Sequence, residues 1–294
     1  MVTIERRVHG LVRYRKFWFP SRSQAMEIAE SLRANDVARF FAVSPTLDNL
    51  PHVIERYMMP TLWIDLSAGP DALLNGMKKK SCRCMIRRAE KMLDRVAIEI
   101  GSEKANRDFL VVYNDFTRAK GLPGLPACWI QENSTHCETL VLYLDGKPLC
   151  GHLVLLDSET GIVRPLYSGS GRLDSPEKAA ACGALNRYLH WQEMQRYHAQ
   201  GFTTYDFGGL GQASIARFKL SFGGFVLTQH FYLLSGLKWV ARLGKVAYEK
   251  ILRRRTFKPK DEDWYKTPKI RVSLLNSAGG KSADGPNDQR WPGT

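Results

Sequence analysis

The segment YDFGGLGQASIARFKLSFGG, residues 205–224, constrains the fold of this chain more than any other stretch. Its first residues alternate aromatic and polar side chains up to a glycine pair, a pattern that predicts a short strand and its end. Residues 213–220 predict a short basic helix, and a second glycine pair introduces a strand over 225–232. The segment therefore predicts a corner in which a helix joins two strands. Taken alone, the same pattern also fits two tight turns and a capped helix.

The charge of the chain indicates an anionic partner. Its 294 residues are enough for one large domain or two modest ones, and the formal net charge is +14 at pH 7. A nucleic acid, a phosphate-bearing substrate or cofactor, and an acidic membrane surface all fit this charge.

Neither a membrane span nor a secretion signal is predicted. No stretch approaches the roughly 18 apolar residues that cross a bilayer, and residues 1–20 lack an apolar run before a cleavage site. We therefore expect a cytoplasmic protein. The six cysteines form no framework, and Cys82-x-Cys84 is too closely spaced for the usual zinc pair. Reduced thiols and no bound metal are expected.

Helix and strand patterns alternate along the chain and predict a mixed α/β fold. Expected helices cover 21–35, 49–59, 71–94, 103–120 and 176–200, and expected strands cover 37–43, 61–66, 139–144, 147–156 and 162–168. Asp145-Gly146 predicts a hairpin turn between two of these strands. The Gly/Pro-rich connection 121–126 is the best candidate for a mobile loop beside a site.

One predicted helix, 71–94, carries an unbalanced positive face. Its basic residues recur at helical spacing, at Lys80, Arg83, Arg87 and Lys91. Glu90 is the one acidic residue within this basic run. Charged helix faces are often simply solvated. Because this face has almost no acidic partners, it also suits a polyanionic ligand.

The order of these motifs resembles the Fem-type peptidyltransferase branch of the GNAT acetyltransferase superfamily. The resemblance covers about residues 10–255 and rests on TLWIDLS (61–67), the helix KKKSCRCMIRRAEK (78–91), the strand meander, YDFGG (205–209) and RFKLSFGG (217–224). It implies a GNAT-like mixed sheet flanked by helices, with a shortened N-terminal half at 1–96 that carries the basic helix and a complete C-terminal half at 97–235. A basic amphipathic helix at 236–257 and a disordered tail at 258–294 would follow.

Members of this branch pass an acyl group from coenzyme A, or an aminoacyl group from a charged transfer RNA, to an amine. The resemblance therefore implies an acyltransferase with acyl-CoA or aminoacyl-tRNA as donor substrate and no bound cofactor. The implied acceptor is an amine-bearing sugar or peptide of a cell-wall or polysaccharide precursor. The phosphate-cradling loop of ordinary acetyltransferases is missing before the 176–200 helix, and Ser168–Gly171 is only a weak substitute.

Acyl transfer to an amine requires a neutral nucleophile and hydrogen-bond donors for the tetrahedral oxyanion. Lys219 resembles the transfer lysine of the family, and we expect it to stabilise the anionic transition state or to hold a donor phosphate. Asp206 could act as a base, as an orienting acceptor or simply as a cap. Arg217 is a candidate phosphate fork, and Tyr205 is either a donor contact or a core aromatic. The donor would also contact the basic helix, through Lys80, Arg83 and Arg87.

Three histidines of the second half, His152, His190 and His198, could serve as bases. A histidine without a partner motif is more often structural, so none of them is assigned a role from the sequence.

Two other classes of protein fit the same residues. A plain CoA-dependent N-acetyltransferase would bind coenzyme A without RNA, and a non-catalytic RNA-binding or scaffold protein on a degraded transferase fold would bind without covalent transfer. Residues 237–255 also predict a helix with one apolar and one cationic face, which could pack on the domain or contact an anionic membrane peripherally.

Overall fold

The computed structural model describes residues 1–8, 12–44, 46–171 and 176–236. The helix predicted at 236–257 and the tail predicted at 258–294 lie outside the described residues, apart from Gly236.

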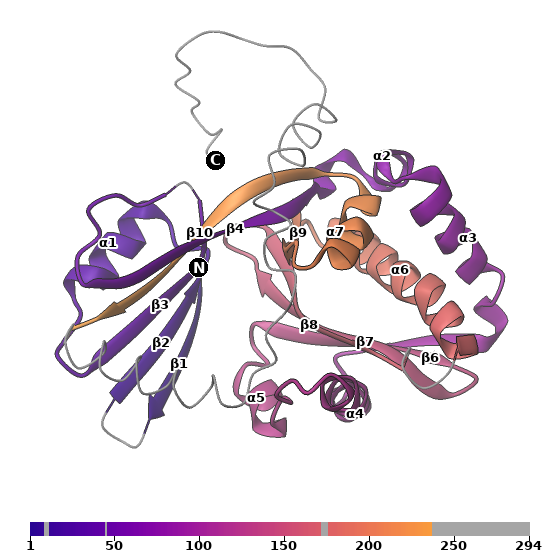
Figure 1. Ribbon diagram of the computed structural model, residues 1–294, viewed down its shortest axis with the longest axis horizontal. Helices are drawn as coiled ribbons and strands as arrows, with labels where there is room; N and C mark the ends of the chain where they lie inside the picture. The colour runs from indigo at the N-terminus through magenta and orange to yellow at the C-terminus, as the bar shows by residue number, and fades with distance from the viewer. Residues whose placement is uncertain (9–11, 45, 172–175, 237–294) are drawn as a thin grey trace, which may run out of the picture. The chain divides into compact units, whose positions relative to one another are not determined.

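The described strands form one ten-stranded mixed sheet in the order β1-β2-β3-β10-β4-β9-β8-β7-β6-β5 (Figure 1). The pairs β2–β3 and β8–β9 are parallel, and the other neighbours are antiparallel. The strand bounds are β1 Val2–Val8, β2 Val12–Trp18, β3 Asp36–Val43, β4 Val53–Asp65, β5 Val96–Ile100, β6 Cys137–Leu144, β7 Lys147–Asp157, β8 Ile162–Ser170, β9 Thr204–Gly209 and β10 Phe225–Ser235. The expected α/β fold class is confirmed.

Helices flank this sheet. Their bounds are α1 Arg22–Glu30, α2 Pro70–Gly76, α3 Cys84–Glu90, α4 Glu103–Ala119, α5 Ala127–Glu132, α6 Pro176–Ala199 and α7 Ala213–Lys219, with single turns η1 Leu66–Ala68, η2 Lys79–Arg83, η3 Leu93–Arg95 and η4 Leu220–Phe222. No described helix is both long enough and apolar enough to cross a membrane. The start of α1 follows from its sequence, because the Ser21 hydroxyl accepts from Gln24 N while the Gln24 side chain accepts from Ser21 N.

Two apolar clusters stabilise the sheet. At the β3 end, Ala25 and Ala29 of α1 pack with Phe40 and Tyr232. A second cluster joins Phe109 of α4 to residues of β6 and β7 and also includes Val2 and Ile4 of β1. Burial of these apolar side chains is the main favourable contribution to folding.

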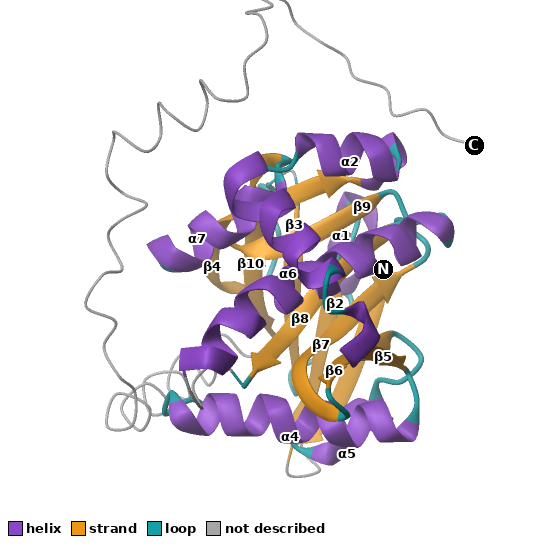
Figure 2. Cartoon of the chain, turned by 90° about the vertical axis from the view of Figure 1, so that its right-hand side faces the viewer, coloured by secondary structure: helices purple, strands orange, loops and turns teal. Residues whose placement is uncertain are grey.

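Helices α4 and α6 lie on opposite faces of the β6–β8 region (Figures 1 and 2). The approach of α4 is close, because a Cβ added at Gly169 of β8 would lie 2.7 Å from Tyr113 Cα. On the other face α6 packs against β7, β8 and α3. The basic segment that precedes residue 97 is therefore built onto the second half.

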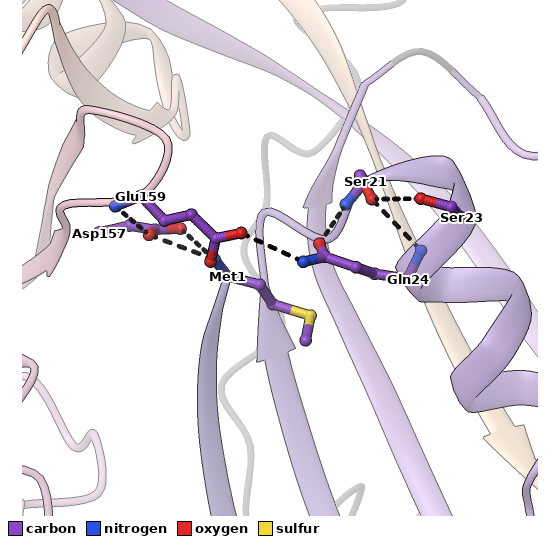
Figure 3. Close-up of polar contacts among 6 residues, drawn as sticks. All are labelled: Met1, Ser21, Ser23, Gln24, Asp157 and Glu159. Carbon is purple, nitrogen blue, oxygen red and sulfur yellow. Dashed lines mark hydrogen bonds and ion pairs between the residues drawn. The ribbon is translucent and has the colours of Figure 1, made fainter. Parts of the chain in front are cut away.

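Strands β4 and β10 extend from one end of the sheet toward the other (Figure 1). A polar contact also links the ends, because the Met1 ammonium lies 2.6 Å from Glu159 Oε2 and 3.2 Å from Asp157 Oδ2 (Figure 3). Gln24 of α1 donates to Glu159 Oε1 at 3.3 Å. The predicted boundary at 96/97 falls at the start of β5, and the predicted division into two halves stays a prediction.

Two predicted helices are wrong. Residues 49–59 contain the start of β4, because Val53, Ile54 and Tyr57 favour a strand and Pro60 cannot continue a helix. The helix predicted at 71–94 is interrupted after Gly76.

At this break, Met77 and Lys78 are extended, with ψ of 147° and 118°. Lys78 N donates to Ser221 O of η4 at 2.9 Å instead of to a helical carbonyl. A π-helical turn, η2, then precedes α3. This tertiary hydrogen bond has no signature in the apolar periodicity from which the long helix was predicted.

Most of the remaining elements match their predictions within a few residues. The 121–126 connection is a loop, and Asp145 and Gly146 form the hairpin turn with φ of 52° and 73°. The β9–α7–β10 corner is confirmed. The sequence did not predict β1, β2, β5 or α5.

Candidate active site

The parallel strands β8 and β9 stop pairing after two positions. Ile162 lies opposite Thr204 and Val163 opposite Tyr205, and among the described residues no later pair joins these strands. On its other edge, β9 shifts register against β4 between Thr61 and Trp63. Beyond this point the described residues of the two strands are not joined by a β8–β9 ladder, and we call this place the β8–β9 opening.

The Asp206 carboxylate lies just beyond the last β8–β9 pair and is fully buried. Its Oδ2 accepts from Arg164 Nη1 and from Gln229 Nε2, both at 2.8 Å. Its Oδ1 accepts from Gly208 N at 2.7 Å. With both oxygens occupied, the geometry favours the orienting role for Asp206 over the role of a base.

Arg164 connects three strands at this point. Its Nη1 also donates to Gln229 Oε1 at 2.9 Å, and its guanidinium lies 5.2 Å from the centre of the Trp18 ring. Gly208, with φ of 69°, leaves room for the guanidinium, since a Cβ there would lie 3.1 Å from Arg164 Nη2. Sequence reasoning missed Arg164, although a charged residue within the apolar β8 strand pattern was an available signal.

Lys219 is the last residue of α7, and its side chain reaches back to β9. Its Nζ donates to the carbonyl oxygens of Phe207 at 2.7 Å and Gly209 at 2.6 Å. Among the described residues these are its hydrogen-bond acceptors, so one of the three ammonium N–H groups is left for a ligand.

Burial lowers the pKa of Lys219 to about 8, and the positive charge of Arg164 acts in the same direction, while Asp206 opposes them. Near neutral pH the side chain is still mostly a cation, but it can lose its proton within a physiological range.

A second buried network lies beneath Lys219, on the α6 side of β9. His152 Nδ1 of β7 lies 2.6 Å from Glu193 Oε1 of α6, and Asn186 Oδ1 lies 3.0 Å from His152 Nε2. The Tyr205 hydroxyl donates to Glu193 Oε2 and lies 2.8 Å from His190 Nδ1.

The charges within this network are coupled. Burial alone would raise the pKa of Glu193, but the charge of His152 and the hydrogen bonds from His152 and His190 outweigh it and lower the pKa. Burial, with the charge of His152, lowers the pKa of His190. Glu193 is thus an anion inside the core, and His190 is neutral at neutral pH.

His152, His190 and Glu193 have side chains that can bind a metal ion, and their ligand atoms lie within 4.8 Å of one another. Each is already hydrogen bonded, and the His152 and His190 rings stack with centroids 4.1 Å apart and an interplanar angle of 30°. Stacked imidazoles do not direct their in-plane lone pairs toward one tetrahedral centre. The arrangement therefore fits a hydrogen-bonded core better than a metal centre.

The structure brings some predicted site residues together and separates others. Asp206 and Tyr205 belong to β9, and Lys219 reaches its main chain. The Tyr205 side chain is fully buried, which favours the core-aromatic alternative, and its contact with a donor stays a prediction. Arg217 of α7 is exposed, and no pairing partner for it is seen in the described residues.

The residues predicted for donor binding on the basic helix lie on η2 and α3. Lys80 and Arg87 are exposed, and Arg83 is half-buried. The Lys78 N to Ser221 O hydrogen bond places the start of this segment beside η4, which directly follows Lys219. The start of the basic segment therefore lies next to the residues around Lys219, although the two sets of residues do not form one cluster.

Comparison with known proteins identifies the domain. Residues 79–220 match the model of the family described as an acetyltransferase (GNAT) domain. The match includes η2, α3 and the β8–β9 opening and reaches one residue past Lys219. Residues 79–220 therefore form a GNAT-type acyltransferase domain. No curated protein matches the sequence.

Solved structures share the fold. The crystal structure of FemX is 13% identical and has a TM-score of 0.57, over 81% of this chain and 85% of that one. The C-terminal domain of a protein described as a lysylphosphatidylglycerol synthetase from Agrobacterium fabrum is 15% identical, with a TM-score of 0.52, over 81% and 82%. L-PGS from Bacillus licheniformis is 15% identical, with a TM-score of 0.51, over 79% and 80%. At these identities the likeness concerns the fold alone.

Proposed function

We propose that this protein forms an amide by moving an acyl or aminoacyl group from a phosphate-bearing donor to an amine. The observation that carries the proposal is Lys219, a partly buried cation held by two β9 carbonyls next to the place where β8 and β9 separate. A donor carbonyl bound beside this place would meet a fixed positive charge.

The chemistry is a nucleophilic substitution at a carbonyl carbon. The neutral amine attacks the ester or thioester carbon, a tetrahedral oxyanion forms, and collapse breaks the bond to the ribose oxygen or the thiol sulfur. The amine loses a proton as the leaving group gains one, so charge is conserved. Lys219 stabilises the oxyanion or a donor phosphate, and the Asp206–Arg164–Gln229 network holds β9 in place.

The donor follows from charge. The exposed cations of η2 and α3 begin beside η4 and continue away from Lys219 along the helix, a path suited to the phosphates of a nucleic acid or of coenzyme A. Aminoacyl-tRNA and acyl-CoA are the two donors of this kind, and both are available in the cytoplasm, where we place the reaction. As acceptor we propose an amine of a cell-wall or polysaccharide precursor, which a peripheral contact with an anionic membrane would bring near.

Mass spectrometry of candidate acceptors tests this function. A panel of amino sugars and lysine-containing peptides is incubated separately with acetyl-CoA and with a pool of charged transfer RNA, using wild type and Lys219→Ala. Added acyl mass with one donor, reduced in the variant, is the expected result. RNA binding without any mass gain from either donor would instead support the non-catalytic alternative.

A further inference from the structure

The buried network of His152, His190, Glu193 and Tyr205 has no part in the chemistry described above. The burial of four polar side chains at this place needs a physical explanation. All four side chains are buried, and Glu193 and His152 have no exposed surface. A buried carboxylate with its hydrogen-bond partners rarely increases stability over apolar side chains of the same shape. Such a network is therefore weakly explained by stability alone.

Tyr205 connects this network to the opening between β8 and β9. It is the β9 residue of the last β8–β9 pair, opposite Val163. Its hydroxyl is fixed by Glu193 and His190. On the opposite face of β9, the next residue, Asp206, is fixed by Arg164 and Gln229. The strand is thus held from both faces at the point where its pairing with β8 ends.

His190 extends the network to α7. Its ring lies 5.0 Å from the Phe207 ring of β9 and 5.7 Å from the Phe218 ring of α7. Phe207 supplies one of the carbonyls that hold Lys219, and Phe218 directly precedes Lys219. His190 therefore packs against both elements whose spacing sets the position of the ammonium.

We propose that Glu193 and Tyr205 are positioning residues for the transfer reaction: they orient His190 between β9 and α7 and so fix Lys219 at the β8–β9 opening. The proposal rests on the function proposed for Lys219. Glu193 and Tyr205 touch neither donor nor acceptor and act through His190 and the β9 main chain.

The chain provides a matched control on the same helix. Tyr197 of α6 is also fully buried, and its hydroxyl donates to a carboxylate, Glu138 Oε2, at 3.0 Å. Its ring packs against Phe202, with the ring centroids 5.8 Å apart. Tyr197→Phe and Tyr205→Phe therefore remove the same group from similarly buried tyrosines, but only Tyr205→Phe releases the network below Lys219.

The experiment measures the pKa of Lys219 directly, by the pH dependence of its acetylation with acetic anhydride in the intact protein, followed by peptide mass spectrometry. Wild type should give a value of about 8. In Tyr205→Phe, α7 is less firmly held and water reaches the ammonium, so the pKa should rise by about one unit toward its ordinary value. Tyr197→Phe should leave the pKa unchanged while lowering the melting temperature by a similar amount.

The kinetic constants of the two variants should differ in the same way as the pKa of Lys219. Tyr205→Phe should lower kcat by about tenfold with little change in KM, as expected for a misplaced catalytic group, and Tyr197→Phe should leave both constants near wild type. Equal Lys219 pKa values in both variants would overturn the positioning role and leave a network that acts on stability alone. The labelling needs no donor or acceptor, so this outcome is separate from a failure of the proposed function, which would show as absence of transfer by wild type.

Discussion

Nη1 of Arg164 lies 2.8 Å from Oδ2 of Asp206, a contact that joins β8 to β9 just past their last paired position. The pair is buried, and Gln229 of β10 hydrogen bonds to both partners. Three strands therefore meet in one polar network beside the opening. Its removal should affect the fold first and activity as a consequence.

Asp206→Ala should lower the free energy of unfolding by about 3 kcal/mol, because it leaves the Arg164 cation buried without its counter-charge. Asp115→Ala is the matched control. It breaks the exposed pair with Arg118 within α4, and such surface pairs contribute less than about 1 kcal/mol. Urea denaturation of both variants measures the difference, and equal losses would contradict the structural role of Asp206.

Lys219→Ala should reduce kcat by about a hundredfold, the usual loss for one charge-stabilising donor. The free energy of unfolding should change by only about 1 kcal/mol, since the two β9 carbonyls lose a hydrogen-bond donor while the cost of burying the ammonium is also removed. Steady-state kinetics with the true donor and thermal denaturation test the two parts. Turnover within about threefold of wild type would exclude the assigned role.

The lowered pKa of Lys219 predicts an alkaline limb in the activity of wild type. If the ammonium is the active form, its protonated fraction falls by about tenfold per pH unit above about 8. The acceptor amine titrates in the opposite direction, so wild type is best compared with Lys219→Arg, whose side chain stays charged. The ratio of wild-type to variant kcat should fall above pH 8. A ratio that rises over this range would instead make Lys219 the general base.

Much of the second half of this fold could be predicted from the sequence. The β6–β7–β8 meander, α6 and the β9–α7–β10 corner have strong periodicity and clear turn residues, and they lie where those signals predict. The failures arise where tertiary contacts override local preference. Residues 53–59 form a strand because they pair with β10, and the helix at 71–94 breaks where Lys78 N bonds to Ser221 O.

The candidate site divides in the same way. Lys219 could be recognised from its motif and Asp206 from its place at a strand end. The partners that define their roles could not, because Arg164 lies 42 positions from Asp206 and Gln229 lies 65 positions from Arg164. Single histidines such as His152 gave no signal, since their network becomes visible only when β7, α6 and β9 are placed side by side.

The last prediction concerns the cations of η2 and α3. Lys80 and Arg87 are exposed and Arg83 is half-buried, so the double variant Lys80→Gln/Arg87→Gln removes charge with little risk to packing. If both cations contact phosphates, tRNA affinity should weaken. The slope of the logarithm of the association constant against the logarithm of the salt concentration should become smaller in magnitude by about 0.7 to 0.9 for each lost contact. Fluorescence titration with total tRNA at several salt concentrations measures both quantities. Arg118→Gln, which removes an exposed cation from α4 that is paired with Asp115, is the control and should leave the slope unchanged. If the double variant also keeps the wild-type slope, the basic segment is a solvated helix face, and the donor must be recognised elsewhere.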